Sequence, residues 1–297
     1  MRGAERGFLL LTGALGEPER KPMTVAQLRI LATRVRESQT VERDRDITAK
    51  DLTTLGYPEE TAQHILRLLS QTILLDRYLQ RGEAAGCVPI TRVSDRYPDV
   101  LRQRLGLESP GCIWAKGDVS LMNMPKVSLV GSRDILSANR AFAWEVGARA
   151  AKQGYALVSG NARGADRIAQ SACLENGGVV ISVVADRLED KQEQGNILYL
   201  SECDFDQPFT AQRAISRNRL IHALPEKTFV AQCALEIGGT WDGTVKNLRH
   251  GWSPVFCMMD GSKASAELQQ MGAVGITSKD LVDIKQLHSD NISFFDQ

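Results

Sequence analysis

Four short runs of glycine, serine and arginine carry groups that bind anions. Glycine lets a backbone approach a ligand closely, N–H groups at a helix start bind phosphate oxygens, and arginine can hold a phosphate with two N–H groups. We therefore predict a pocket for a phosphate or a nucleic-acid backbone, the alternative being that the runs are ordinary turns. The candidate DNA-binding or phosphate-binding residues are Gly131, Ser132, Arg133, Ser159, Gly160, Arg163, Gly164, Arg217, Asn218, Arg219, Gly238, Gly239 and Thr240.

Groups suited to catalysis are sparse by comparison. Glu202 and Asp204 follow an apolar run, and Asp166 and Asp242 lie in glycine-containing loops, but no Ser-His-Asp spacing or carboxylate pair stands out. We predict no catalytic residue and expect Asp166 to cap or brace its own loop. GSRDIL stands where a dinucleotide-binding chain carries G-x-G-x-x-G, and the four histidines form no HxxxH pattern. No cofactor and no metal are therefore expected.

An alternation of apolar and helical segments must position these runs. Short β-branched runs separated by helical segments predict an α/β fold with an extended, Rossmann-like, doubly wound and mostly parallel sheet. The carboxyl ends of parallel strands lie at one edge of the sheet, so the four runs are expected to meet there. The expected strands are 126–131, 155–159, 179–184, 197–201, 227–233 and 254–259, and the expected helices are about 138–153, 163–176, 210–223 and 241–250.

The chain before residue 85 has a different, helical pattern. Residues 1–22 are expected to be a leader, flexible or weakly packed, and residues 23–84 a small helical (SAM-like) domain. Thr24 and Thr48 are placed to cap helices, and a long helix is expected over about 59–82. The domain either packs against the rest of the chain or carries a helix-hairpin-helix geometry that binds DNA.

Charge is balanced overall, with 36 Lys and Arg against 36 Asp and Glu. This balance argues against the wide positive face of many duplex-DNA binders. No apolar run reaches the roughly 18 residues of a membrane helix, and residues 8–11 are too short for a secretion signal, so a cytoplasmic protein without membrane contact is expected. Cations are concentrated in residues 131–167, which hold six against three acids: Arg133, Arg140, Arg149, Lys152, Arg163 and Arg167.

Taken in order, these motifs resemble the DNA-processing protein A (DprA/Smf) family. The matching stretches are VGSR, SGNARGAD, SE at residues 201–202, SRNRLIHAL, and a glycine-rich turn before PVF, within about residues 85–260. The resemblance implies a Rossmann-like domain over 85–297 that is not an enzyme and binds single-stranded DNA. It further implies loading of a RecA-type recombinase, a role in recombination, DNA uptake or phage defence, and a homodimer. The pocket it implies consists of Gly131, Ser132, Arg133, Ser159, Gly160, Arg163, Arg217 and Arg219.

The chain departs from the family pattern at two motifs. The family's GID is Gly164-Ala165-Asp166 here, and its SGSLITA turn is replaced by GGTWDGT. The GGTWDGT turn is more similar to the loops of related Rossmann folds that bind nucleotides or cleave nucleotide monophosphates. Two alternatives therefore stay open: a sensor of a small nucleotide ligand in the same pocket, and a nucleotide phosphoribohydrolase. The hydrolase would need Glu236 and Arg217 as a catalytic pair.

Overall fold

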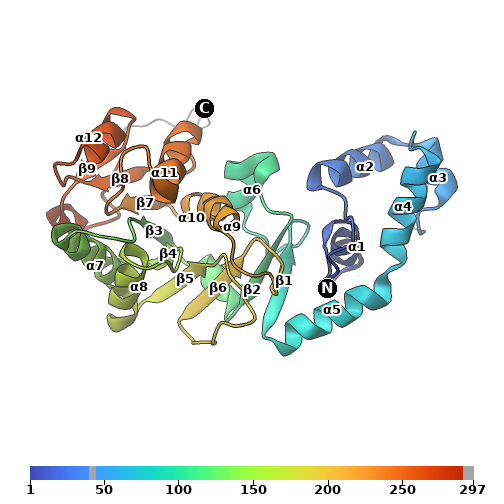
Figure 1. Cartoon of the computed structure of the whole chain (residues 1–297), viewed down its shortest axis with the longest axis horizontal. Coiled ribbons are helices and arrows are strands. Elements are labelled where there is room, and N and C mark those ends of the chain that lie inside the picture. The colour runs from blue at the N-terminus through green and yellow to red at the C-terminus, as the bar shows by residue number, and fades with distance from the viewer. Residues whose placement is uncertain (40–44, 290–297) are drawn as a thin grey trace. The chain divides into compact units, whose positions relative to one another are not determined.

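The computed structural model describes residues 1–39 and 45–289 (Figure 1). The chain divides into two compact units, the first made of Met1–Tyr97 and Pro110–Trp114, the second of Pro98–Ser109 and Ala115–Gln297. The division thus falls after Tyr97, whereas the sequence suggested a boundary after residue 84. It lies later because strand β1 (Cys87–Thr91) belongs to the first unit, and β2 (Cys112–Lys116) runs across the division.

The first unit is mainly helical, as expected. Thr24 and Thr48 accept hydrogen bonds from the backbone N–H groups of Gln27 and Asp51, so both threonines cap helices as predicted. Buried apolar side chains, among them Leu52 and Ile65, form its core. Its helices are α1 (Gly3–Thr12), α2 (Val25–Glu37), α3 (Ala49–Thr54), α4 (Glu59–Ser70) and α5 (Thr72–Ala84).

The structure differs from the sequence expectation at two places in this unit. Residues 1–22, expected as a weakly packed leader, contain helix α1, in which Phe8, Leu9, Leu10 and Leu11 are all buried. The single long helix expected over 59–82 is two helices, because Gln71 has φ −80° and ψ 41°, outside the helical range.

Parallel strands form the sheet of the second unit, which confirms the predicted α/β class. The strands are almost entirely buried, as in sheets covered by helices on both faces. From one side to the other the order is β6 (Ile197–Ser201), β5 (Val179–Val183), β4 (Ala156–Ser159), β3 (Lys126–Val130), β7 (Lys227–Val230), β8 (Val255–Met258) and β9 (Val274–Ile276).

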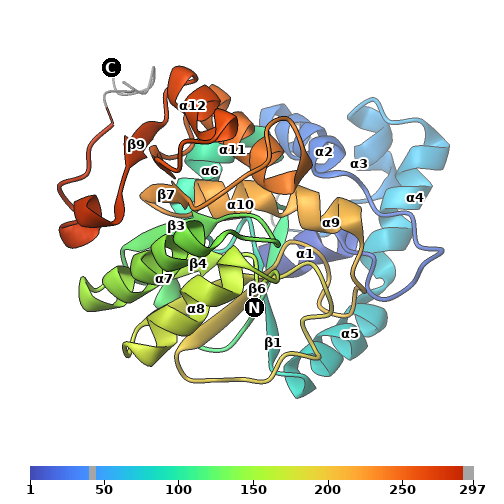
Figure 2. The same ribbon diagram turned by 60° about the vertical axis from the view of Figure 1, so that its left-hand side comes forward.

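The chain winds outward from β3 in both directions. It first runs through α7 (Ser137–Lys152) and α8 (Ala165–Glu175) toward β5 and β6, and later through α11 (Gly238–His250) and α12 (Lys263–Gln270) toward β9. Right-handed crossovers in opposite directions place these two pairs of helices on opposite faces of the sheet. Helices α7 and α8 pack side by side (Figure 2). Gly147 permits this, since a Cβ there would lie 2.1 Å from the carbonyl oxygen of Ala169.

Two helix boundaries matter for the site. The helix expected over 210–223 is divided into α9 (Ala211–Ser216) and α10 (Asn218–Ala223), which meet at Arg217. The helix expected over 241–250 begins earlier, so Gly238-Gly239-Thr240 is the first turn of α11 instead of a loop. The remaining elements are α6 (Asp99–Leu105) and the 3-10 turns η1 (Gly106–Glu108), η2 (Val119–Asn123) and η3 (Ser278–Val282).

No helix within residues 1–39 and 45–289 is both long enough and apolar enough to span a membrane.

Candidate nucleic-acid interface

The winding of the sheet reverses between β3 and β7, and the loops after these two strands meet there. In doubly wound sheets, ligands bind outside the carboxyl ends of the strands at such a reversal. The Ser132 N–H donates to the carbonyl oxygen of Gln232 (2.9 Å), and the Thr240 hydroxyl donates to that of Gly131 (3.1 Å). The structure therefore brings the first and last of the predicted runs together.

The glycines of the first two runs allow neighbouring backbone segments to pack closely. A Cβ at Gly131 would lie 2.5 Å from the Cβ of Ala165, the first residue of α8. Gly164 has a φ of +88°, and a Cβ there would lie 2.3 Å from the carbonyl oxygen of Arg133. The Ala165 N–H also donates to the carbonyl oxygen of Ser132 (3.2 Å). These contacts join the loop after β3 to the start of α8.

Asp166 braces the loop after β4, as the sequence predicted. Its carboxylate is buried and accepts hydrogen bonds from the backbone N–H groups of Gly160 and Ala162, both at 3.1 Å. Burial raises the pKa of Asp166, while the nearby Arg217 guanidinium acts in the opposite direction. Ser159 is also used internally, since its hydroxyl accepts a hydrogen bond from the Gln170 side chain (2.6 Å). The Gly160 N–H and Ser159 hydroxyl are thus already engaged within the protein.

Arg217 is buried under this loop. Its side chain is only 7% exposed, and its Nη2 donates to the carbonyl oxygen of Gly160 (2.7 Å). A Cβ at position 160 would lie 1.8 Å from Nη1 of Arg217, so the arginine requires glycine there. Burial lowers the pKa of Arg217, and Asp166 partly offsets that effect. The structure gives Arg217 an internal, bracing position beside the predicted pocket.

The rest of the SRNR run also contacts protein. Arg219 donates from Nη2 (2.9 Å) and Nε (3.1 Å) to one carboxylate oxygen of Glu202, whose side chain is 7% exposed. Asn218 donates to the carbonyl oxygen of Gly239 (3.1 Å), which ties α10 to the first turn of α11. The ion pair with Arg219 gives a structural role to Glu202, which follows Ser201 at the end of β6.

Arg133 and Arg163 lie in the open, by contrast. Together with Arg140 and Arg167 they line a cavity of about 620 Å³ beside the loops after β3 and β4. Arg163 pairs with Asp134 (2.7 Å), but their side chains are 74% and 89% exposed. An ion pair so exposed to water contributes little, so Arg163 can exchange Asp134 for a phosphate at small cost.

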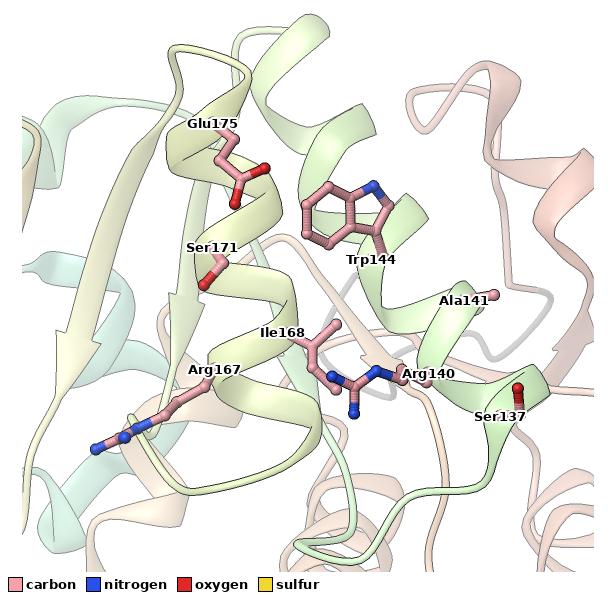
Figure 3. Close-up of a pocket in the computed structure, with 8 residues that line it drawn as sticks. All are labelled: Ser137, Arg140, Ala141, Trp144, Arg167, Ile168, Ser171 and Glu175. Carbon is pink, nitrogen blue, oxygen red and sulfur yellow. The ribbon is translucent and has the colours of Figure 1, made fainter.

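A second cavity, of about 760 Å³, continues between α7 and α8 (Figure 3). It shares Arg140, Arg167 and Ile168 with the first cavity and adds Trp144. Sequence reasoning did not select Arg140 or Trp144 as site residues. Their i, i+4 spacing within a predicted helix, which puts both on one face, is the signal that could have found them.

The structure does not bring together the catalytic pair that a phosphoribohydrolase would need. Glu236 is exposed, whereas Arg217 is buried, and in the described part of the chain the two form no ion pair. Within that same part, no three His, Cys, Asp or Glu side chains cluster as metal ligands would.

Comparison with known proteins connects this architecture to a described family. The family model of "DNA recombination-mediator protein A" matches residues 89–280. The DNA processing protein DprA of Streptococcus pneumoniae is 30% identical over 254 residues, which cover 76% of this chain and 89% of the relative. Protein Smf of Escherichia coli is 29% identical over 141 residues, covering 43% and 37% respectively.

Two solved structures show the same fold. The X-ray structure of DprA from Streptococcus pneumoniae has a TM-score of 0.71 at 22% identity, with 91% of this chain and 96% of that chain covered. The structure of DNA processing protein A from Helicobacter pylori has a TM-score of 0.54 at 23% identity, with 65% and 93% covered. The Helicobacter pylori protein is described as having a unique single-stranded DNA binding mode.

Proposed function

Because the chain belongs to the DNA recombination-mediator protein A family, we propose that its carboxyl-edge site binds single-stranded DNA. The role of the chain lies in DNA processing and recombination. The observation that carries the finer proposal is the exposure of Arg133 and Arg163, on the loops after β3 and β4, beside the reversal of the sheet. Both guanidinium groups can reach phosphate oxygens without breaking a buried contact.

The distribution of charge favours one strand over a duplex. The chain is neutral overall, and this cluster of four arginines gives the candidate site a local positive charge. A single backbone with unstacked bases fits a narrow cationic surface, whereas a duplex presents two strands and needs a wider one. The Helicobacter pylori relative, described as binding single-stranded DNA, is consistent with this choice.

The proposal is tested by fluorescence polarisation with labelled oligo-dT, a blunt duplex of equal length, and nucleoside monophosphates as competitors, in a series of salt concentrations. We expect oligo-dT to bind more tightly than duplex, with an affinity that falls as salt rises. Equal affinity for duplex and oligo-dT would refute the preference. Tight binding of a mononucleotide alone would favour a nucleotide sensor, and its turnover a phosphoribohydrolase.

We also propose that the protein is a homodimer that passes its bound strand to a RecA-type recombinase. The support is the resemblance to the DprA/Smf family together with β9, an end strand of the sheet that a twofold copy could cover. Light scattering at micromolar concentration tests the dimer, and a monomer up to about a hundred micromolar would exclude it. Recombinase filament formation on strands coated with a strand-binding protein, with and without this chain, tests the transfer.

A further inference from the structure

We propose that the strand bound at the carboxyl edge continues into the groove between α7 and α8, where a base stacks on Trp144 and a phosphate pairs with Arg140. This inference rests on the proposed function, since it extends the same strand away from the sheet edge. It adds Trp144 and Arg140 as contact residues and states the path that the strand takes from the sheet edge.

The groove adjoins the cavity at the carboxyl edge. At the edge, Arg133, Arg163 and Gly164 line the first cavity, and Arg140 and Arg167 line both cavities. The first cavity holds about 620 Å³ and the second about 760 Å³. A strand that leaves Arg133 therefore has Arg140 and Arg167, which line both cavities, as its next cationic contacts.

Trp144 provides the stacking surface. It is 39% exposed, whereas Trp114, Trp241 and Trp252 are 1%, 8% and 5% exposed. In Figure 3 its indole ring projects from α7 into the groove, toward α8. Aromatic side chains beside a cationic track are the usual platform for bases of single-stranded DNA, because every base has a face that can stack.

Arg140 provides the charge beside that ring. It lies one helical turn before Trp144 on the same face of α7, and Figure 3 places its guanidinium beside Ile168, between the two helices. Within the described residues, the side chains of Arg133, Arg140 and Arg167 make no ion pair or hydrogen bond. Over both cavities, four arginines face only two acids, Asp134 and Glu175. An anionic chain complements this surface.

The test combines affinity with the fluorescence of the exposed tryptophan. Oligo-dT of about 4 and about 16 nucleotides, which bracket common site sizes, is titrated into the full chain and its variants. We expect the longer strand to quench tryptophan emission of the unaltered protein. Trp144→Ala should weaken its binding about 5- to 100-fold, while Trp144→Phe, which keeps a ring, should stay close to the unaltered affinity.

Charge variants test Arg140 in the same assay. Arg140→Ala should weaken binding and reduce the slope of log K against log salt by about 0.7, the value for one single-strand phosphate contact. Arg249→Ala is the matched control, since Arg249 is an exposed arginine near the end of α11 and outside both cavities. Melting temperatures of all variants confirm that each is folded.

The outcomes separate this inference from the proposed function. If oligo-dT binds and Arg133→Ala weakens it, while Trp144→Ala and Arg140→Ala bind normally and emission is unchanged, the groove is empty and the inference fails alone. If the unaltered protein binds no oligo-dT, both proposals fail. If Trp144→Ala alters the oligomeric state in light scattering but not the affinity, a second copy of the chain covers this face, and the inference is again overturned.

Discussion

Two pairs of arginines lie at the same edge of one sheet and meet opposite surroundings. Arg133 and Arg163 extend into solvent from the loops after β3 and β4. Arg217 and Arg219, at the junction of α9 and α10 and just after it, are held by the carbonyl of Gly160 and the carboxylate of Glu202. The first pair is available to a ligand, whereas Arg217 supports the loop after β4, which carries Arg163, and Arg219 holds Glu202 after β6.

The difference teaches that a motif of arginines does not by itself identify a phosphate site. A guanidinium that already donates to buried protein acceptors would have to leave them unsatisfied in order to bind a phosphate, and an unmade hydrogen bond to a charged group is costly. Burial and existing partners therefore decide which arginines bind and which ones brace. The predictions below test this division, from the largest effect to the smallest.

Replacing Arg217 should destabilise the fold. Arg217→Ala removes the main positive charge beside the buried Asp166 carboxylate and the donor to the Gly160 carbonyl. Leaving a buried acceptor without its charged donor typically costs about 1–3 kcal/mol in the free energy of unfolding, and the lost charge beside Asp166 adds to this cost. Urea unfolding measures this loss, and Arg133→Ala, at an exposed position, should change stability by less than about 0.5 kcal/mol.

Position 160 offers an independent check on the same brace. Gly160→Ala should destabilise the unaltered chain by about 1–3 kcal/mol through overpacking, and by less in an Arg217→Ala background, because the clash at 1.8 Å is then gone. Additive effects would show that the two residues do not contact. Normal stability of Arg217→Ala with lost DNA binding would instead make Arg217 a phosphate ligand.

Replacing Arg133 should leave stability unchanged and weaken binding. Removing the interaction between this exposed guanidinium and a phosphate should cost about 1–3 kcal/mol of affinity for oligo-dT and lower the salt dependence. Fluorescence polarisation in a salt series measures both. An Arg133→Ala variant with a lowered melting temperature and normal affinity would show that Arg133 braces the fold and does not bind the ligand.

The free energy of unfolding should also depend on pH, through a buried histidine. Burial lowers the pKa of His222, on α10, from 6.5 to about 3. Below pH 6.5 the unfolded chain therefore takes up a proton at this histidine that the folded chain does not, so stability falls as pH falls from 6.5 toward 3. At pH 5 the loss should be about 2 kcal/mol.

Unfolding in urea between pH 7 and pH 5 measures this loss. In His222→Gln the contribution should vanish and the pH slope should flatten, whereas His250→Gln, at an exposed position, should keep the slope of the unaltered protein. A His222→Gln variant with the original slope would assign the pH dependence to other groups.

The smallest effect is expected at Asp134. Asp134→Asn removes a negative charge beside the exposed arginines and releases Arg163 from its ion pair. Since exposed pairs contribute about 0–1 kcal/mol, oligo-dT affinity should rise only about two- to fivefold, with stability unchanged. Weaker binding by Asp134→Asn would mean that the aspartate positions Arg163 for the strand.

The sequence predicted the parallel sheet and the loops at its edge, because strand and helix periodicities are local properties of the chain. It also predicted the brace by Asp166, since an aspartate beside a glycine turn has the backbone N–H groups of that turn within reach. The burial of Arg217 was not predictable, because the arginines of SRNR are spaced like phosphate ligands and the sequence does not show which loop covers them. Its burial follows from the break between α9 and α10 and from the missing Cβ at Gly160, which only the folded chain brings together.

The hydrogen bonds around Asp166 also determine whether the loop after β4 loses its conformational entropy on folding or on ligand binding. The loop after β4 includes Asn161 at φ 57° and Gly164 at φ 88°, and fixing each residue of a chain costs about 1–2 kcal/mol of entropy. Asp166 and Arg217 hold this loop in place before any ligand arrives, so that loss belongs to folding and not to binding. The proposed DNA strand would therefore meet a preorganised surface, and its affinity would depend on the side chains it touches instead of on the ordering of a loop.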